Sequence, residues 1–381
     1  MEKQIYLDYN ATTPVHVRVL EEMLPWFTDQ FWNAASSHHL GSKARNAVET
    51  GREQVAELIG CQKTEIIFTS GSTESINLAI KGVVEASLDR TGFITSAAEH
   101  KAVLDVAVWL EEQGKKVTLL PVDSHGEIDT NLFLSNLSSG TALVSLMAAN
   151  NETGVITQLE TFIEEAKKVN SLFHTDATQA VGRLPFNVET LGVDLASLSG
   201  HKIYGPKGVG ALYIRRGTPI KSMLHGGGHE RGLRSGTLNV PGIVGLGAAA
   251  QLCGELREKR NKKTKELVDR LVKGLRQELL DIQVLAEETA RLPNTVNIRF
   301  VGADADAVIA NTPTIAVSSG SACTSMIPAP SHVLLAMGLT QNEAEECLRF
   351  SIGDHTTKKE IDITIKGLVS AVKRIIEVSN K

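Results

Sequence analysis

The stretch "SLSGHKIYGPKGVGALYI", Ser197 to Ile214, decides the fold, because it joins two apolar strand-like runs through a glycine-rich turn. Lys202 follows the first run and precedes the rigid turn that begins at Tyr204. The lysine is therefore expected near the carboxyl edge of a sheet, where ligands bind in open α/β sheets. Desolvation there favours the neutral amine, which is nucleophilic enough to form a Schiff base. Taken alone, a solvated surface lysine is the more common alternative.

Short apolar runs alternate with helix-like segments from about residue 50 to residue 215. Helical periodicity is visible in residues 47–60 and 74–86. This alternation predicts a mostly parallel sheet with helices on both faces, a three-layer α/β domain. The strands are expected in residues 65–69, 92–97, 116–122, 141–148, 171–177 and 193–200.

The pattern changes after Val240. Residues 243–280 predict one long helix or two joined helices, with a charged, solvated middle. The strand-like runs 294–300, 314–319 and 347–352 then mix with helices, and Thr357 to Glu360 forms a capping-box pattern. We therefore expect a large domain in residues 15–255 and a smaller α+β domain built from residues 1–14 and 256–381.

Composition excludes several classes of function. The 381 residues include 39 basic and 44 acidic ones, a formal charge of -5, which gives no electrostatic argument for nucleic acid or an anionic membrane. No apolar segment is long enough to span a membrane and the N-terminus lacks a leader pattern, so a cytoplasmic protein is expected. The four cysteines are too scattered for a disulfide framework and have no metal-type spacing, so no metal site is predicted.

The segment "FTSGSTESINLAIKG", residues 68–82, has the pattern of a strand, a turn and a helix. Backbone N–H groups at the helix start, with the hydroxyls of Ser72 and Thr73, could bind a phosphate, because the orphan donors and the helix dipole favour an anion. No Gly-Lys-Ser/Thr follows, so this is not a Walker A loop. A plain N-cap turn is the alternative.

Two further strand ends carry titratable side chains. Asp176 ends the run 171–177 and needs a cationic partner or dense hydrogen bonding if it is buried there. It could cap a helix, or it could pair with a protonated ring nitrogen. His100 follows the run 92–97, where it could stack on a cofactor ring and move protons, or be a structural histidine.

Arg349 lies in "CLRFSI", residues 347–352, where apolar side chains alternate along a strand. The apolar set should face the core, which leaves Arg349 toward a cleft, where its fork can bind a carboxylate. A surface ion pair is the alternative. The segment 225–239 concentrates glycine, arginine and histidine; since Gly-Gly-Gly separates His225 from His229, an anion-binding or interface loop is favoured over zinc.

Cys323 stands apart from the other cysteines, because it lies among small residues in "AVSSGSACTSMIPAP", residues 316–330. A structural thiol would have apolar neighbours, as Cys61 and Cys253 do, whereas small-residue packing is favoured for Cys347. We expect this segment to act as a tether, with residues 318–320 letting the thiol swing and residues 326–330 limiting its reach.

A phosphate-binding turn, an acidic residue after a strand and a lysine in a glycine-rich loop together are what pyridoxal phosphate requires. At these motifs the sequence resembles the group I cysteine desulfurases, fold-type I pyridoxal phosphate enzymes of the class V aminotransferase family. The resemblance covers essentially the whole chain. It is carried by "YLDYNATTP", "FTSGSTESINLAIKG", "EHKAV", "NNETG", "DATQ", "SGHKIYGPKG", "GGGHERGLRSGT", "SSGSACTS" and "RFSIG".

The resemblance implies that Lys202 binds the cofactor covalently, that His100 stacks on its ring as acid and base, and that Cys323 is the nucleophile. It implies further binding roles for Asp176 at the ring nitrogen, Gln179 at the ring hydroxyl, Thr73, Ser199 and His201 at the phosphate, Thr237 from the partner subunit of a homodimer, and Asn150 and Arg349 at the substrate carboxylate.

The reaction implied is conversion of L-cysteine to L-alanine, with the sulfur left as a persulfide on Cys323 and then passed to a protein acceptor. Iron–sulfur assembly, tRNA thiolation and DNA phosphorothioate modification are alternative destinations. The segment 33–39 departs from the Asn-Pro of many members, and the chain ends soon after its last helix without their longer tail. An aminotransferase or selenocysteine lyase of the same fold, or a non-catalytic phosphate-binding protein, are the competing hypotheses.

Overall fold

A mixed sheet of seven strands forms the centre of the computed structural model, which describes residues 4–87, 89–319 and 330–379. Its strand order is β2-β8-β7-β6-β5-β3-β4; β8 runs antiparallel to both neighbours and the other pairs are parallel. The strands are β2 (Ile66–Thr69), β3 (Gly92–Ser96), β4 (Val117–Leu120), β5 (Thr141–Ser145), β6 (Leu172–Asp176), β7 (Leu195–Ser199) and β8 (Gly210–Ile214).

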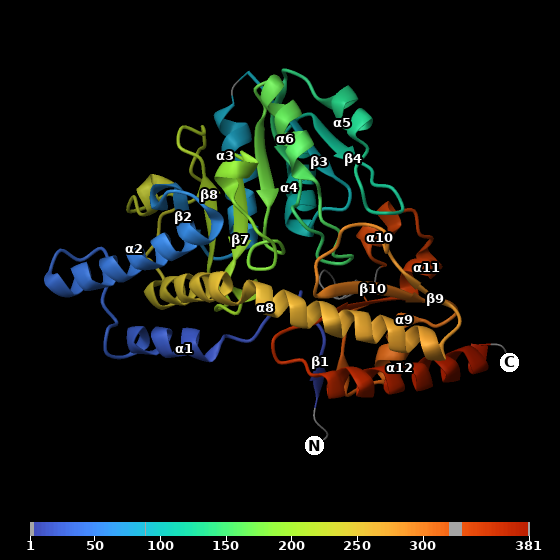
Figure 1. Cartoon of the computed structure of the whole chain (residues 1–381). Coiled ribbons are helices and arrows are strands. Elements are labelled where there is room, and N and C mark those ends of the chain that lie inside the picture. The colour runs from blue at the N-terminus through green and yellow to red at the C-terminus, as the bar shows by residue number, and fades with distance from the viewer. Residues whose placement is uncertain (1–3, 88, 320–329, 380–381) are drawn as a thin grey trace.

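Helices cover both faces of this sheet (Figure 1). Successive strand residues point to opposite sides, so Phe93 packs in one core and Ile94 in the other. The Phe93 side is covered by α3 (Ser72–Ala86) and α4 (Lys101–Glu112). The other side is covered by α2 (His39–Ile59), α5 (Thr130–Asn136), α6 (Leu159–Lys168) and the first part of α8 (Val240–Glu278). The predicted three-layer α/β architecture is confirmed.

Helix α8 is a single helix of 39 residues, which settles the alternative left open by the sequence. Its buried residues up to Cys253 belong to the core of the large sheet, and those from Leu267 onward belong to a second core. The charged stretch between them is mostly exposed or half-buried. The helix therefore links two hydrophobic cores, and a domain boundary at residue 255 stays a prediction.

The second core contains an antiparallel sheet in the order β12-β10-β9 and a parallel pair of β1 with β11. Helix α12 begins with the predicted capping box, since the Thr357 and Glu360 side chains accept from each other's backbone N–H. The elements are β1 (Ile5–Tyr6), β9 (Ile282–Val284), β10 (Thr295–Phe300), β11 (Ile315–Ala316), β12 (Cys347–Ser351), α9 (Ala305–Asn311), α10 (His332–Ala336), α11 (Gln341–Glu345) and α12 (Lys358–Ser379).

Short helical elements complete the described chain, and none of its helices is long and apolar enough to cross a membrane. The N-terminal segment after β1 forms a bridge between Asp8 and Ser351, which places the start of the chain beside β12. The short elements are α1 (Val17–Met23), η1 (Leu24–Phe27), η2 (Lys63–Glu65), α7 (Val188–Leu191), η3 (Gly200–Lys202) and η4 (Glu230–Gly232).

Candidate active site

The carboxyl ends of the central parallel strands meet around one cavity. Asp176 ends β6, Lys202 follows β7 on the short helix η3, and His100 follows β3 at the start of α4. Parallel strands bring their carboxyl ends to the same edge, which is why residues so far apart in sequence converge. The cavity is lined by Asn10, Ala11, Ser72, His100, Met147, Ala149, Asn151, Asp176, Thr178, Gln179, Lys202 and Arg349.

Lys202 is half-buried and points into this cavity rather than lying on the open surface. Its amino group donates to the backbone carbonyl oxygens of Asn10, at 2.5 Å, and Ala11, at 2.8 Å. The N-terminal segment therefore contacts the lysine amino group directly. No local sequence pattern marks Asn10, because it acts through its backbone carbonyl oxygen.

Asp176 is buried, with 7% of its surface exposed, and its Oδ1 accepts from the Thr178 N–H at 2.9 Å. This is a local turn contact and not the cap of a helix, so the capping alternative is excluded. A buried carboxylate needs compensation, and the cavity's cations and donors face it. Asp176 can therefore serve as the partner of a cationic ring nitrogen.

His100 is the N-cap residue of α4, and its Nδ1 accepts from the Ala102 N–H at 3.1 Å. That contact places the ring proton on Nε2, the nitrogen not used by the cap. Burial lowers the pKa of His100 below its usual value, Asp176 opposes this, and Lys202 adds to it. The imidazole is thus neutral near pH 7, with one nitrogen available to exchange a proton.

The helix start of α3 forms one end of the site. Gly71 has a φ of 153°, a conformation that residues with side chains rarely adopt, and Ser72 lines the cavity. The turn lies close against β8, because a Cβ on Gly210 would come within 2.6 Å of the Gly71 Cα. Thr73 follows with an exposed side chain. The first-turn N–H groups of α3 are the kind of donors that bind anions.

Two more of the expected phosphate residues lie after β7. Ser199 is buried at the strand end, and a Cβ on Gly71 would lie 3.7 Å from its Oγ. His201 Nδ1 lies 3.1 Å from Thr12 Oγ1, and burial lowers the pKa of His201 to about 4. The imidazole is therefore neutral at physiological pH and can act as a hydrogen-bond donor.

Gln179 joins the cavity to the N-terminal segment and to the half-buried Arg183. Its Nε2 donates to the Asn10 carbonyl oxygen at 3.1 Å, and its Oε1 accepts from Arg183 Nη1 at 2.7 Å. Burial lowers the pKa of Arg183. The side-chain amide is held at both ends, so its orientation in the cavity is fixed.

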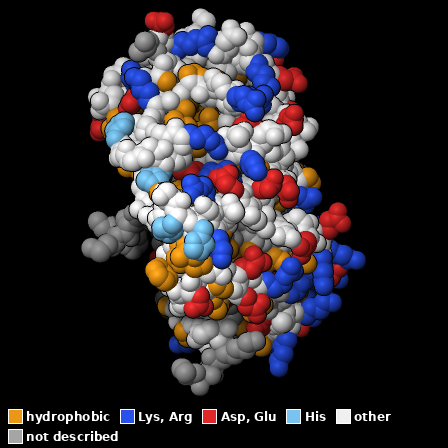
Figure 2. Space-filling model, turned by 90° about the vertical axis from the view of Figure 1, so that its left-hand side faces the viewer, with side chains coloured by type: hydrophobic (Ala, Val, Ile, Leu, Met, Phe, Trp, Pro, Cys, Tyr) orange, Lys and Arg blue, Asp and Glu red, His pale blue; other side chains and the backbone are white. Residues whose placement is uncertain are grey.

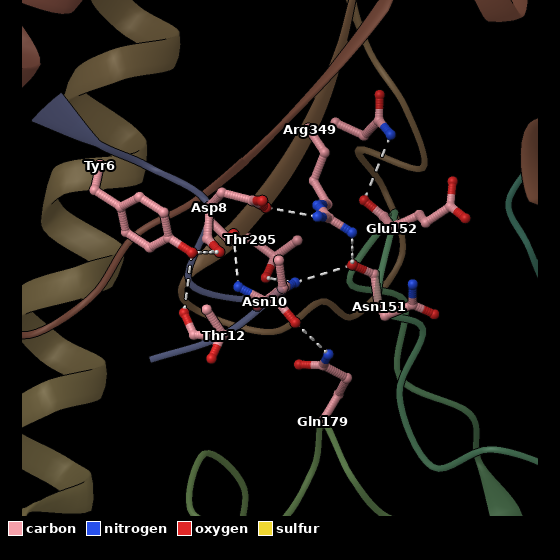
Figure 3. Close-up of polar contacts among 12 residues, drawn as sticks. Tyr6, Asp8, Asn10, Thr12, Asn151, Glu152, Gln179, Thr295 and Arg349 are labelled. Carbon is pink, nitrogen blue, oxygen red and sulfur yellow. Dashed lines mark hydrogen bonds and ion pairs between the residues drawn. The ribbon is translucent and has the colours of Figure 1, made fainter. Parts of the chain in front are cut away.

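Arg349 is almost completely buried, with 2% of its side chain exposed, and lines the cavity (Figure 3). Its Nη2 donates to Asp8 Oδ1 at 2.6 Å and its Nη1 donates to the Asn151 carbonyl oxygen at 3.1 Å. Its Nε is buried and has no hydrogen-bond partner among the described residues. The surface-pair alternative is excluded; the unpaired Nε–H is enclosed by protein, so a carboxylate reaches it only when the surrounding side chains move.

The neighbouring asparagines differ from the expectation. The Asn150 Nδ2 donates to the Ala98 carbonyl oxygen at 3.0 Å, and its Oδ1 accepts from the Glu152 and Thr153 N–H groups at 2.8 and 2.9 Å. Its side chain thus builds the turn that follows β5, while Asn151 lines the cavity. Sequence reasoning could not separate two adjacent asparagines on a loop.

Glu99, next to His100, is another residue that the sequence reading missed. It is fully buried, and its Oε1 accepts from the Met147 N–H at 2.6 Å, tying the end of β3 to the segment after β5. Burial raises the pKa of this carboxyl well above its usual value. This shift favours the neutral carboxyl, which links the two loops without adding charge near Asp176.

The remaining expected residues lie elsewhere. Thr237 is exposed and does not line this cavity; its segment is anchored by Glu230, whose buried carboxylate pairs with Arg52 through two contacts of 2.7 Å. Cys323 lies outside the described residues, as do most of the segments expected to tether it. Among the described residues no group of three or more potential ligands forms a metal site, and His229 instead accepts from Gly236 N–H.

The other cysteines are packing residues. Burial raises the pKa of the Cys61 thiol to about 12, of Cys253 to about 11 and of Cys347 to about 12. Cys347 packs in an apolar cluster beside α10 and α11 and does not line the cavity. None of these three thiols forms a thiolate readily at neutral pH.

Known proteins resemble this chain in sequence and backbone over most or all of its length. The aminotransferase class-V family model matches residues 5–364. The chain is 47% identical to cysteine desulfurase IscS of Anaeromyxobacter dehalogenans, over all of this chain and 95% of that protein. Among solved structures, a NifS-like protein has a TM-score of 0.91 at 39% identity, covering 97% of this chain and all of that one. The structure described as SspA in complex with cysteine has a TM-score of 0.82 at 36% identity; the match covers 93% of this chain and all of that one.

Family match, sequence identity and backbone similarity all extend across both cores of the molecule. The family is one of pyridoxal phosphate-dependent enzymes. The chain belongs to the class-V aminotransferase family and, within it, to the cysteine desulfurases.

Proposed function

We propose that this chain uses pyridoxal 5'-phosphate to convert L-cysteine to L-alanine and transfers the sulfur, as a persulfide on Cys323, to a protein acceptor. The observation that carries the proposal is that Lys202, Asp176, His100 and Arg349 line one cavity. These are a nucleophilic amine, a ring-nitrogen partner, a proton carrier and a carboxylate receptor. A non-catalytic phosphate-binding protein would need only the α3 helix start.

The residues around the cavity fit this cofactor. Lys202 would bind it covalently, Asp176 would pair with its ring nitrogen and His100 would stack on the ring. Gln179, held by Asn10 and Arg183, would meet the ring hydroxyl. The start of α3 supplies N–H donors for the phosphate. The side chains that we assign to the phosphate are Ser72, Thr73, Ser199 and His201, with Thr237 of the partner subunit.

When bound, the cofactor supplies an electron sink that stabilises negative charge on the substrate's α-carbon. The chain's own residues then move protons. Because burial keeps the His100 imidazole neutral and Nδ1 accepts from the Ala102 N–H, the ring offers its Nε2–H as a donor; it can take up a proton only at Nδ1, by giving up the Ala102 contact. The Lys202 amine, when free of the cofactor, would be placed to carry protons to and from the substrate's α-carbon.

Arg349 would hold the substrate carboxylate through its Nε edge, the side without a described partner. We assign the accompanying amide contact to Asn151, since Asn150 is engaged in its own turn. Holding the carboxylate fixes which way the Cβ–S bond points, and orientation of this kind is a main source of rate enhancement.

In the sulfur step, the Cys323 thiolate attacks the sulfur of the bound substrate. A new S–S bond forms and the substrate's Cβ–S bond breaks, with its electron pair left on the carbon skeleton. That carbon takes up one proton and the product leaves as L-alanine. The net reaction converts one enzyme thiol and one L-cysteine to one enzyme persulfide and one L-alanine. No external oxidant or reductant is needed.

The test is intact-mass spectrometry after incubation with L-cysteine. The wild-type protein should gain the mass of one sulfur atom, removable by a reductant, and release alanine. The Cys323→Ala variant should keep its yellow colour and gain no sulfur, while Lys202→Ala should lose the colour. Consumption of L-cysteine without alanine would favour transamination, and alanine formation without added sulfur on the protein would favour direct release of the sulfur, as expected of a selenocysteine lyase.

We further propose a homodimer that acts in the cytoplasm, where a reducing environment keeps the Cys323 thiol available. The acceptor is a protein, and iron–sulfur assembly, tRNA thiolation and DNA phosphorothioate modification are all compatible destinations. A pull-down with the persulfidated enzyme would identify it: a partner captured only by the persulfide form, and absent with Cys323→Ala, is the expected acceptor.

A further inference from the structure

We propose that Asp8 is the residue that sets the affinity of the site for the substrate carboxylate; the proposal rests on the function proposed above. Asp8 comes from the N-terminal segment and contacts Arg349 on β12, 341 positions away in the sequence. The two side chains form an ion pair of 2.6 Å between Asp8 Oδ1 and Arg349 Nη2. The expected substrate therefore meets an arginine that already has a counter-ion.

The position of Asp8 is fixed from several sides (Figure 3). Its backbone carbonyl oxygen accepts from the Tyr6 hydroxyl at 2.8 Å, and the residue forms a bridge with Ser351. The carboxylate is 19% exposed, whereas the guanidinium is 2% exposed. A charge as deeply buried as that of Arg349 is costly without a partner, so Asp8 stabilises the arginine before substrate arrives.

The remaining contacts of Arg349 determine how a ligand can bind. Its Nη1 is held by the Asn151 carbonyl oxygen, which leaves the buried Nε edge. A carboxylate on that edge shares the guanidinium with Asp8, and the two negative charges repel across it. The second carboxyl group nearby, Glu152, is buried, accepts from the Ser331 hydroxyl at 2.5 Å, and has its pKa raised by burial. Asp8 is therefore the carboxylate in direct contact with the guanidinium, and from there it opposes the ligand's charge.

This arrangement lowers the affinity of Arg349 for the substrate carboxylate. Asp8 lowers the cost of burying Arg349 in the free enzyme and reduces the gain when substrate binds, which favours release of the carboxylate of alanine after sulfur transfer. Asp8 is thus a positioning residue that acts through Arg349.

The experiment measures L-alanine binding to the cofactor-loaded protein by calorimetry, together with thermal unfolding. In Asp8→Asn the amide oxygen can still accept from Nη2 but the charge is gone, so the Kd for L-alanine should fall about ten-fold. The apparent melting temperature without ligand should fall, and saturating L-alanine should raise it by more than in the wild type. KM for L-cysteine should fall with kcat unchanged or lower.

Controls separate charge from shape. Asp8→Ala should also lower the Kd for L-alanine. Asp8→Glu keeps the charge and should hold that Kd within about three-fold of the wild type. Asp269→Asn, on an exposed helix face, should leave it unchanged. In Arg349→Gln, adding Asp8→Asn should produce no gain, because the two act as a pair. An unchanged or higher Kd in both neutral variants would overturn the proposal. A protein that forms no persulfide would instead refute the proposed function, which the mass measurement reports separately.

Discussion

Asn150 and Asn151 are neighbours in the chain, and the structure gives them different tasks. Asn150 donates to Ala98 and accepts from Glu152 and Thr153, so it stabilises the turn that carries the site. Asn151 contributes its carbonyl oxygen to Arg349 and lines the cavity. At the scale of single residues, the role of each asparagine depends on which of its polar atoms already form hydrogen bonds within the protein.

Alanine substitutions should separate the two roles. Asn150→Ala leaves buried backbone donors unpaired, so it should lower the free energy of unfolding by about 2–3 kcal/mol, measured by urea denaturation. Asn151→Ala should leave that free energy nearly unchanged and raise KM for L-cysteine about ten-fold, through the loss of a polar contact to substrate. If Asn150→Ala raised KM with no loss of stability, the expectation that Asn150 binds the substrate carboxylate would be restored.

Strands β5, β6 and β7 hold a buried histidine between them. His174 is fully buried, and its two ring nitrogens lie 2.8 Å from the hydroxyl oxygens of Ser145 and Ser197. Burial lowers the pKa of His174 to about 3. The side chain therefore links the three central strands as a neutral group, two residues before Asp176 on the same strand, β6.

This histidine makes the sheet sensitive to acid. The unfolded chain binds a proton on His174 near pH 6.5, but the folded protein does so only near pH 3, so the unfolded state gains protons first as the pH falls. Between these values the free energy of unfolding should drop by about 1.4 kcal/mol per pH unit from this residue.

Urea titrations at several pH values check the effect. His174→Gln should be less stable at pH 7 and should show a shallower decline between pH 6.5 and 4, since the substituted side chain has no proton to gain. The exposed His125→Gln should decline as the wild type does. Equal slopes in wild type and His174→Gln would contradict the assignment.

The proposed homodimer would need an exposed apolar surface, and the described chain has one. Large apolar side chains are more than half exposed along α1, η1 and the residues after them, and Figure 2 shows hydrophobic and histidine side chains lying together on one face. Thr237 is exposed on a segment anchored through Glu230, as a residue directed to another subunit would be. The exposed apolar residues in this region are Val17, Leu24, Phe27 and Phe31.

Mixing two defective variants should restore activity if each site uses Thr237 of the partner subunit. Lys202→Ala and Thr237→Ala should each be defective alone. After subunit exchange, half the dimers are mixed and each has one intact site, so desulfurase activity should reach roughly one quarter of the wild-type value. Light scattering should give the mass of a dimer. A monomeric mass, or no recovery in exchanged mixtures, would exclude the shared site.

Much of the fold follows from local patterns. The apolar runs predicted as strands coincide with β2 to β7 within a few residues, because a buried parallel strand needs a short continuous apolar stretch. Lys202 and Asp176 were recognisable as site residues because both follow such runs, and the ends of parallel strands converge. The capping box of α12 was equally visible, since both partners lie within four residues.

The sequence by itself determined the three-layer sheet, the family and the chemical types present at the strand ends, because these depend on residue periodicity and on motifs of neighbouring residues. Only the tertiary structure decided that Asp8 pairs with Arg349, that Asn10 contacts Lys202 and that Asn151 rather than Asn150 lines the cavity. These contacts join segments up to 341 positions apart, and their energy depends on burial and on hydrogen-bond geometry, which no local pattern encodes.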